Sequence, residues 1–221
     1  MLSTADVAKV FIDFIEKKIK KFPFSEGPMT AESSEIKDTL LALNHNKFFT
    51  INSQPRVNGV SSTHPTYGWG PEKGFVYQKA YFEFFIPSQV LKPLVTFLEE
   101  YDMITYQAVN KKGEEVTNVS EEDNVNAVTW GVFRSKEIIQ PTVVDNTAFK
   151  VWKDEAFRSW TDKWAVCYEK DSPSSALLND IAETYYLVNI VDNDFVNGDL
   201  CKVMLKFIAL NQQLINEVDG K

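Results

Sequence analysis

Apolar residues recur every three or four positions in several stretches of the chain, which is the spacing of one face of an α-helix. Helices are therefore predicted to begin near Thr4, Thr30, Pro87, Thr147, Pro173 and Leu200. Ser3 or Thr4 can cap the first helix, which is expected to continue to about Lys21, and Asp199 can cap the last. Tryptophans at helical spacing within 147–170 are typical of a buried core face rather than of a ligand site.

Other stretches are short and rich in β-branched or aromatic residues, which favours strands. Strands are predicted over residues 48–53, 75–86, 103–109, 115–117, 126–133 and 138–144. The second of these carries aromatic residues at odd and even positions alike, so it should be buried on both faces. Strands and helices follow one another without a regular βα rhythm. The expected fold class is α+β, as a single domain with two small mixed sheets, or one split sheet, and helices packed around them.

A long irregular segment separates the first two predicted strands. It begins at Gln54-Pro55, where proline cannot donate to a sheet ladder, and contains Gly59, Gly68 and Gly70. Long ordered loops of this kind more often carry function than simple connection. This segment and its two flanking strands are therefore the first place to look for a binding site.

The charge balance narrows the classes of partner. The chain has 221 residues and a formal net charge of −8, which argues against nucleic acid, since phosphate contacts need clustered basic residues. The only basic cluster, within 17–21, falls at a predicted helix C-terminus, where cations are favoured. No apolar run is long enough for a membrane span, and charges interrupt the N-terminus where a signal peptide would be apolar. A soluble cytoplasmic protein is expected.

The residues give little support for catalysis. The two histidines, His45 and His64, have no recognisable nucleophile pattern around them, and the two cysteines lie far apart. Gly68–Pro71 is not followed by a helix that could face a phosphate. Asp192–Asp194 offers too few oxygens for a hard cation and suits a loop or cap better. We expect no catalytic site, no metal site and no resident cofactor in this chain.

What remains is a set of short polar side chains at the ends of predicted elements. They are Glu32, Ser33, Thr50, Ser53, Thr129 and Thr142. Hydroxyls on rigid strands can bond to a neutral heterocycle or a ribose, and one carboxylate suits an ammonium or a sulfonium group. From composition alone, ordinary sheet threonines are the commoner explanation.

Several longer words in the sequence carry a family resemblance. They are TINSQP at 50–55, GWGP at 68–71, QKAY at 78–81, EFF at 83–85, NAVTWG at 126–131, EIIQPTVVD at 137–145, WKDEAF at 152–157 and DNDF at 192–195. In order and spacing these words resemble the C-terminal regulatory domain of eukaryotic-type methylenetetrahydrofolate reductase, from about Pro28 to Phe195. Residues 1–27 match less well and are expected to hold an N-terminal helix and the end of an interdomain linker, with the regulatory domain over 28–221.

The resemblance implies a ligand and a role. It implies that the domain binds S-adenosylmethionine as an allosteric inhibitor, with S-adenosylhomocysteine competing, through the six polar residues named above. Ser33 stands where a threonine is more usual in the family, and it keeps the hydroxyl. Glu32 is expected to face the ligand's amino group.

The family's catalytic part lies outside this chain. The resemblance implies a separate (β/α)8 barrel that carries FAD and uses NADH or NADPH, so this fragment is expected not to be an enzyme itself. The expected partners are that catalytic domain and a second copy of the chain in a homodimer. The alternative interpretation is that the fragment serves chiefly as the module that assembles the dimer.

Overall fold

The computed structural model describes residues 3–20, 22–25, 27–68, 74–119, 130–133, 160, 163–164 and 175–217. The helices are α1 (Thr4–Ile15), α2 (Lys37–His45) with a 3₁₀ turn before it (Ser33–Ile36), α3 (Ser88–Leu98), α5 (Ser175–Thr184), α6 (Leu200–Leu210) and α7 (Gln212–Glu217). The strands are β1 (Phe49–Gln54), β2 (Val57–Ser61), β3 (Phe75–Gln78), β4 (Tyr81–Pro87), β5 (Ile104–Asn110), β6 (Glu115–Thr117), β7 (Trp130–Phe133) and β8 (Tyr185–Asp192).

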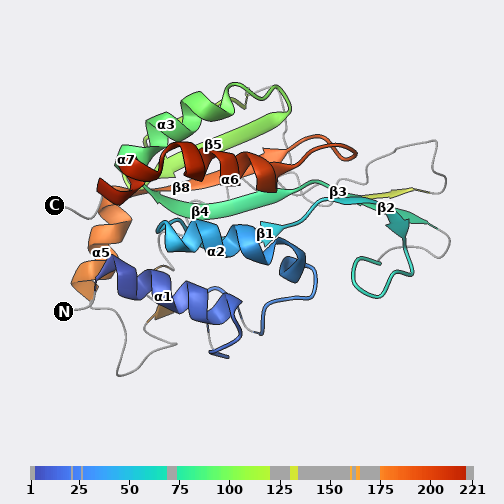
Figure 1. Cartoon of the computed structure of the whole chain (residues 1–221), viewed down its shortest axis with the longest axis horizontal. Helices are drawn as coiled ribbons and strands as arrows, with labels where there is room; N and C mark the ends of the chain where they lie inside the picture. The colour runs from blue at the N-terminus through green and yellow to red at the C-terminus, as the bar shows by residue number, and fades with distance from the viewer. Residues whose placement is uncertain are drawn as a thin grey trace.

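These strands form two sheets. The larger has the order β1-β4-β8-β5-β6 and the smaller has the order β2-β3-β7, and the smaller lies beyond one end of the larger in Figure 1. The α+β class with two sheets is confirmed. Every pairing between described strands is antiparallel, so the sheets are antiparallel rather than mixed as expected.

One bent two-stranded ribbon joins the sheets. β1 pairs with β4 in the larger sheet, and their continuations β2 and β3 pair in the smaller one. The expectation of a single strand over 75–86 is therefore wrong, because Lys79 and Ala80 leave the ladder between β3 and β4. The physical reason lies opposite them at Pro55, which has no N–H to donate and so cannot continue a regular ladder.

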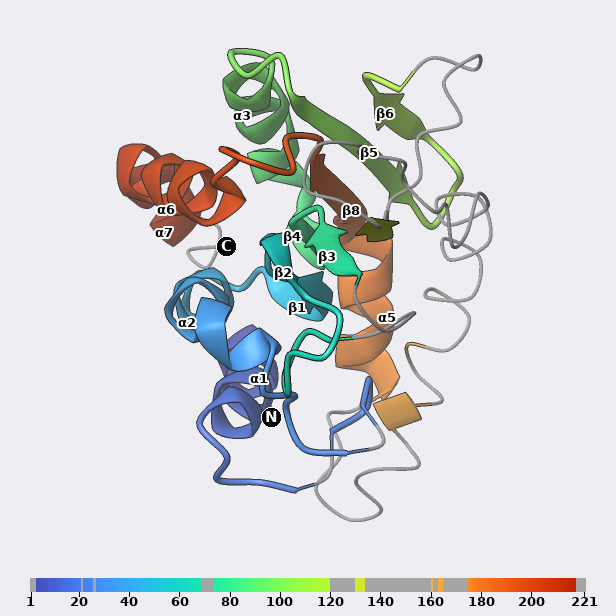
Figure 2. The same ribbon diagram turned by 90° about the vertical axis from the view of Figure 1, so that its right-hand side faces the viewer.

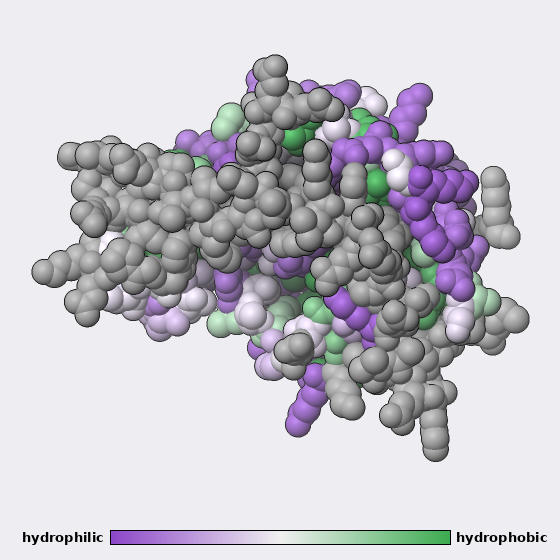
Figure 3. All heavy atoms as spheres, turned by 180° about the vertical axis from the view of Figure 1, so that it is seen from behind, coloured by the Kyte–Doolittle hydropathy of each residue, from purple (hydrophilic) through white to green (hydrophobic). Residues whose placement is uncertain are grey.

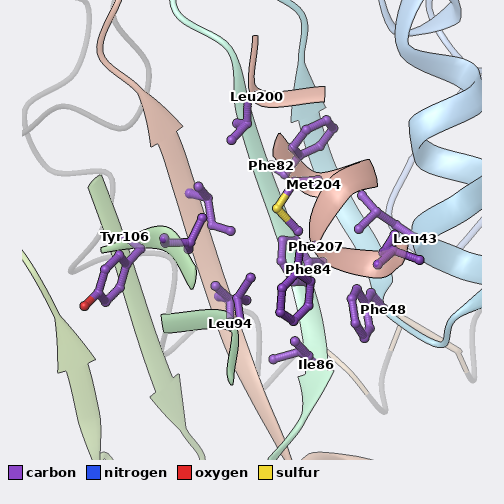
Figure 4. Close-up of a cluster of buried hydrophobic side chains, with 14 of the residues drawn as sticks. Leu43, Phe48, Phe82, Phe84, Ile86, Leu94, Tyr106, Leu200, Met204 and Phe207 are labelled. Carbon is purple, nitrogen blue, oxygen red and sulfur yellow. The ribbon is translucent and has the colours of Figure 1, made fainter. Parts of the chain in front are cut away.

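Helices cover both faces of the larger sheet, as the two views in Figures 1 and 2 show. On one face, α2, α3 and α6 bring leucines and phenylalanines against Phe82, Phe84 and Ile86 of β4. Figure 4 shows this cluster, with Leu43, Leu94 and Phe207 among the labelled side chains of these helices. On the other face, α1 and α5 pack around Phe85 and Phe49. β4 is buried along its whole length, which confirms the prediction of burial on both faces.

The first helix ends six residues earlier than predicted. Lys17 adopts a positive φ of 62°, and the amides of Lys17 and Lys18 donate to the carbonyls of Phe14 and Asp13. This is a Schellman C-cap, in which a left-handed residue closes the helix. Glycine usually occupies that position, so a lysine there gave no sequence signal for the end of the helix.

Other predictions have mixed outcomes. Asp199 does cap α6, since its side chain accepts from the amide of Lys202. The second α-helix begins at Lys37 rather than near Thr30, because the 3₁₀ turn comes first. Trp160 and Trp164 are fully buried, as expected for core residues. The rest of the predicted 147–170 helix and the predicted 138–144 strand lie outside the described residues.

A row of polar side chains crosses the larger sheet within its apolar surroundings. Glu83 of β4 lies opposite Asn52 of β1 and Asn189 of β8, and Asn189 lies opposite Gln107 of β5. Glu83 and Asn189 are each only 4% exposed. Their atoms Oε1 and Oδ1 accept no hydrogen bond from any described residue. Burial raises the pKa of Glu83 to about 8, so its carboxyl group is mostly neutral at pH 7.

We expect the stability of the wild-type chain to fall as the pH rises toward 8. Glu83 is protonated in the folded state up to about pH 8 but ionises near pH 4.5 when unfolded, so the folded state must keep a proton that the unfolded state releases. The cost grows by on the order of 1.4 kcal/mol per pH unit across that interval. Glu83→Gln removes it, so urea unfolding should show the variant gaining on the wild type between pH 5 and pH 8.

The matched control is Glu100→Gln, which makes the same substitution at an exposed position after α3. Its difference from the wild type should stay small at both pH values. A Glu83→Gln difference that is the same at pH 5 and pH 8 would contradict the neutral state of Glu83.

Candidate ligand-binding site

A cavity of about 290 Å³ lies beside β1, the strand at one end of the described order of the larger sheet. Aromatic side chains of α1 and of the segment after it form an apolar wall, including Phe11, Phe14 and Phe24. Polar side chains from residues 30–33 and from β1 line another part of it, together with apolar residues such as Met29 and Leu40. This volume is near the lower end of the range of small-molecule sites, roughly 300–1,000 Å³.

Four of the six predicted site residues line this cavity. They are Glu32, Ser33, Thr50 and Ser53, which come from the turn before α2 and from β1. Thr129 and Thr142 lie outside the described residues. The structure therefore brings four of the residues together, and their contact with a ligand stays a prediction.

A β-bulge at Ile51 places two of the hydroxyls on one face of the strand. Thr50 pairs with Phe84 and Ser53 pairs with Phe82, while the register shifts between Thr50 and Asn52. In a regular strand, residues three apart point to opposite faces. Ile51 is the extra residue of the bulge, so Thr50 and Ser53 lie opposite two residues of β4, Phe84 and Phe82, that are only two positions apart. Both hydroxyl residues therefore lie on the same face of the strand. Bulges often re-aim side chains at sites of this kind.

Asn44 of α2 holds Thr50 in place. Its Nδ2 atom donates to Thr50 Oγ1 over 2.7 Å and to the carbonyl of Leu40 over 2.8 Å, and its Oδ1 atom accepts from the amide of Thr50. Asn44 is completely buried. Its role was not predicted, although the sequence carries a signal: Asn44 is a polar residue beside Leu40 and Leu43 on the buried stripe of the helix.

The turn before α2 orders the other two residues. The Oγ1 atom of Thr30 accepts from the amide of Ser33 over 3.1 Å and donates to the Ser33 hydroxyl over 3.0 Å. The Thr30 side chain thus bonds to the first residue of the 3₁₀ turn, as short hydroxyl residues commonly do near helix starts. Glu32 lies at the N-cap of that turn rather than in the first turn of an α-helix.

Glu32 is a half-buried carboxylate beside this cavity. Burial raises its pKa, a hydrogen bond from Gln78 lowers it, and the nearby charge of Glu35 raises it. The Nε2 atom of Gln78 donates that bond to Glu32 Oε1. No lysine, arginine or histidine in the described part of the chain forms an ion pair with Glu32. A half-buried carboxylate that has no cationic partner among the described residues favours a cationic ligand.

Two other segments weighed for chemistry have structural roles. The Nδ1 atom of His64 accepts from the amides of Thr66 and Tyr67, so this histidine closes its own loop. The side chain of Asp192 accepts from the amide of Asp194. The side chain of Asp194 accepts from the amides of Val196 and Asn197. Among the described residues, no group of three or more acidic, histidine or cysteine side chains could hold a metal ion.

Comparison with known proteins decides the family. A family model described as "MTHFR, SAM-binding regulatory domain" matches residues 4–212, where MTHFR is methylenetetrahydrofolate reductase and SAM is S-adenosylmethionine. This chain belongs to that family. The resemblance found in the sequence words is thereby confirmed, and the relatives below agree with it.

Three relatives illustrate the similarity. A Zea mays protein named methylenetetrahydrofolate reductase (NADH) 1 is 49% identical over 90% of this chain and 33% of its own length. Methylenetetrahydrofolate reductase 1 of Schizosaccharomyces pombe is 45% identical over 89% of this chain and 32% of its own. A Caenorhabditis elegans protein named probable methylenetetrahydrofolate reductase (NADPH) is 40% identical over 87% of this chain and 31% of its own. This regulatory domain therefore spans about a third of the length of these relatives.

The first helix contributes to the candidate site of this regulatory domain. Phe11 and Phe14 of α1 line the cavity, and α1 packs against α2 and β1. The family match also includes α1. The division into 1–27 and 28–221 stays a prediction. Among the described residues, no helix combines the length and the apolarity needed to cross a bilayer.

We expect Asn44→Ala to destabilise the domain by roughly 1–3 kcal/mol, because it leaves buried groups of Thr50 and Leu40 without their partners. Urea unfolding measures the loss. Asn46→Ala is the matched control at the end of α2, since Asn46 is only half-buried; its Nδ2 atom donates to the carbonyl of Ala42 and its Oδ1 atom accepts from the exposed Gln212. Equal losses for the two variants would contradict the role assigned to Asn44.

Proposed function

We propose that this domain binds S-adenosylmethionine in the cavity beside β1, with Glu32 facing the ligand's positive charge. The observation that carries the proposal is the half-buried Glu32 carboxylate, which lacks a cationic partner among the described residues and lines the same cavity as Ser33, Thr50 and Ser53. A carboxylate in a partly dry site is stabilised when a cation binds beside it.

The remaining walls suit the rest of such a ligand. In our proposal Glu32 faces the ammonium group, while the hydroxyls bond to the adenine, the ribose and the carboxylate. The aromatic wall formed by Phe11, Phe14 and Phe24 offers flat apolar surface to a heterocycle. Thr129 and Thr142 complete the proposed set of contacts. S-adenosylhomocysteine carries the same ammonium, ribose and adenine groups, so we propose that it competes for this site.

We further propose that binding inhibits a catalytic domain in the same, longer protein. That domain would be a (β/α)8 barrel with FAD that accepts hydride from NADH or NADPH, and this regulatory domain would perform no catalysis itself. A ligand can inhibit at a distance only if it binds one arrangement of the two domains more tightly than another. We propose a cytoplasmic homodimer as the working form of the whole protein.

The alternative role as a dimerisation module has less support from the described surface. The exposed large apolar side chains lie on separate elements, for example Met103 before β5, Val116 on β6 and Leu210 at the end of α6. On the face shown in Figure 3, the coloured residues are largely hydrophilic, with apolar ones in small separate patches. A stable dimer usually needs a larger continuous surface.

We expect Glu32→Gln to weaken binding of both S-adenosyl compounds by roughly 10- to 100-fold, which corresponds to losing a charge-assisted hydrogen bond. Calorimetric titration measures the two affinities. The loss should be similar for both, because the ammonium is common to them while the sulfonium charge is present only in S-adenosylmethionine. A loss confined to S-adenosylmethionine would place Glu32 at the sulfonium instead.

Glu35→Gln is the matched control, since Glu35 lies in the same turn but is exposed. It should change either affinity by less than about threefold. The titrations are repeated with a longer chain that includes the interdomain linker. If Glu32→Gln binds as tightly as the wild type in both lengths of chain, the proposed site is wrong.

A further inference from the structure

Two buried glutamines close the corner where the ribbon passes from one sheet to the other. The Nε2 atom of Gln54, at the end of β1, donates to the carbonyl of Lys79 over 2.8 Å. The Nε2 atom of Gln78, at the end of β3, donates to the carbonyl of Pro55 over 2.9 Å. These side chains replace the backbone ladder that is interrupted at Pro55, so the corner has a defined geometry without regular pairing.

Gln78 makes one more contact, and it is with the candidate site. An amide nitrogen carries two hydrogens. In Gln78 one points to the Pro55 carbonyl and the other to Oε1 of Glu32. Gln78 is 4% exposed, so water competes little for these bonds. The backbone of the corner therefore fixes the direction from which Glu32 receives its hydrogen bond.

We propose that Gln78 is the positioning residue of this site: by donating to Oε1 of Glu32 it holds this carboxylate in place for a cationic ligand. The ligand part of this inference rests on the proposed function. The position of Glu32 then depends on the corner between the two sheets, since Gln78 is anchored there.

The surroundings of Glu32 show why a neutral donor matters. Glu35, in the same turn, adds negative charge. The other titratable groups that interact with Glu32 are the hydroxyls of Tyr81 in β4 and of Tyr67 in the loop before β3, and burial raises the pKa of both tyrosines. None of these groups supplies a positive charge. Among the surrounding groups, the bond from Gln78 is the one that lowers the pKa of Glu32 against the effect of burial. Without it, nothing among these groups would oppose the effect of burial, and the pKa of Glu32 would rise further above its usual value.

The first experiment needs no ligand. The carboxyl carbon of Glu32 is followed by NMR across a pH titration in the wild type, in Gln78→Met and in Gln107→Met. Methionine has nearly the same length as glutamine but cannot donate. Gln107→Met is a matched control, because Gln107 of β5 is also buried and donates to a glutamate, Glu115 of β6, at the opposite end of the strand order from β1. The titration midpoint of Glu32 should rise in Gln78→Met alone.

The second experiment measures the affinity for S-adenosylmethionine by calorimetry between pH 5 and pH 7 on the same three proteins, a range in which the ligand's ammonium group stays mostly protonated. Gln78→Met should bind roughly 10-fold more weakly than the wild type at the low end of this range, where more of its Glu32 is protonated, and the loss should shrink toward pH 7. A variant that was merely less stable would not recover as the pH rises. Gln107→Met should follow the wild-type profile throughout.

The outcomes separate the two proposals. An unchanged Glu32 midpoint in folded Gln78→Met would overturn the positioning role. A raised midpoint with unchanged affinity would overturn its importance for binding. If the wild type binds no S-adenosylmethionine, the proposed function fails, while the ligand-free titration still decides whether Gln78 controls Glu32. Should Gln78→Met not fold, Gln78→Asn shortens the same donor by one carbon and should shift the midpoint in the same direction.

Discussion

The strand pair β4–β8 at the centre of the larger sheet is buried on both faces, and this constraint organises the rest of the domain. Phe84 of β4 faces one apolar cluster and Phe85, the next residue, faces the other. A sheet with two apolar faces needs cover on both sides, which the helices provide. The amphipathic stripes of α1, α2, α3 and α6 follow from this requirement.

The candidate site lies where that regular packing ends. β1 lies at one end of the described strand order of the larger sheet, and the bulge at Ile51 turns Thr50 and Ser53 to one face of it. A few residues further on, the ribbon bends at Pro55. Edge strands, bulges and corners leave polar groups that a regular ladder would use up, so a small ligand can be recognised there without disturbing the core.

Two glutamates illustrate how burial and hydrogen bonding together set the charge of a carboxyl group. Glu83 is almost fully buried, its Oε1 atom receives no hydrogen bond from the described residues, and its pKa rises to about 8. Glu32 is half-buried and receives a hydrogen bond from Gln78, which works against the effect of burial on its pKa. The same chemical group is thus a mostly neutral part of the sheet in one place and, in our proposal, a contact for a cationic ligand in another.

The sequence by itself determined the elements whose pattern is local. Helical stripes, the two-sided burial of β4 and the cap at Asp199 could all be predicted, because each depends on residues within a few positions of one another. The site residues came from the family resemblance, since isolated hydroxyls have no distinctive spacing. Only the tertiary structure decided where the ribbon bends and that Asn44 and Gln78 hold Thr50 and Glu32. Gln78 and Glu32 are 46 positions apart, and a hydrogen bond between two such residues leaves no periodic trace in the chain.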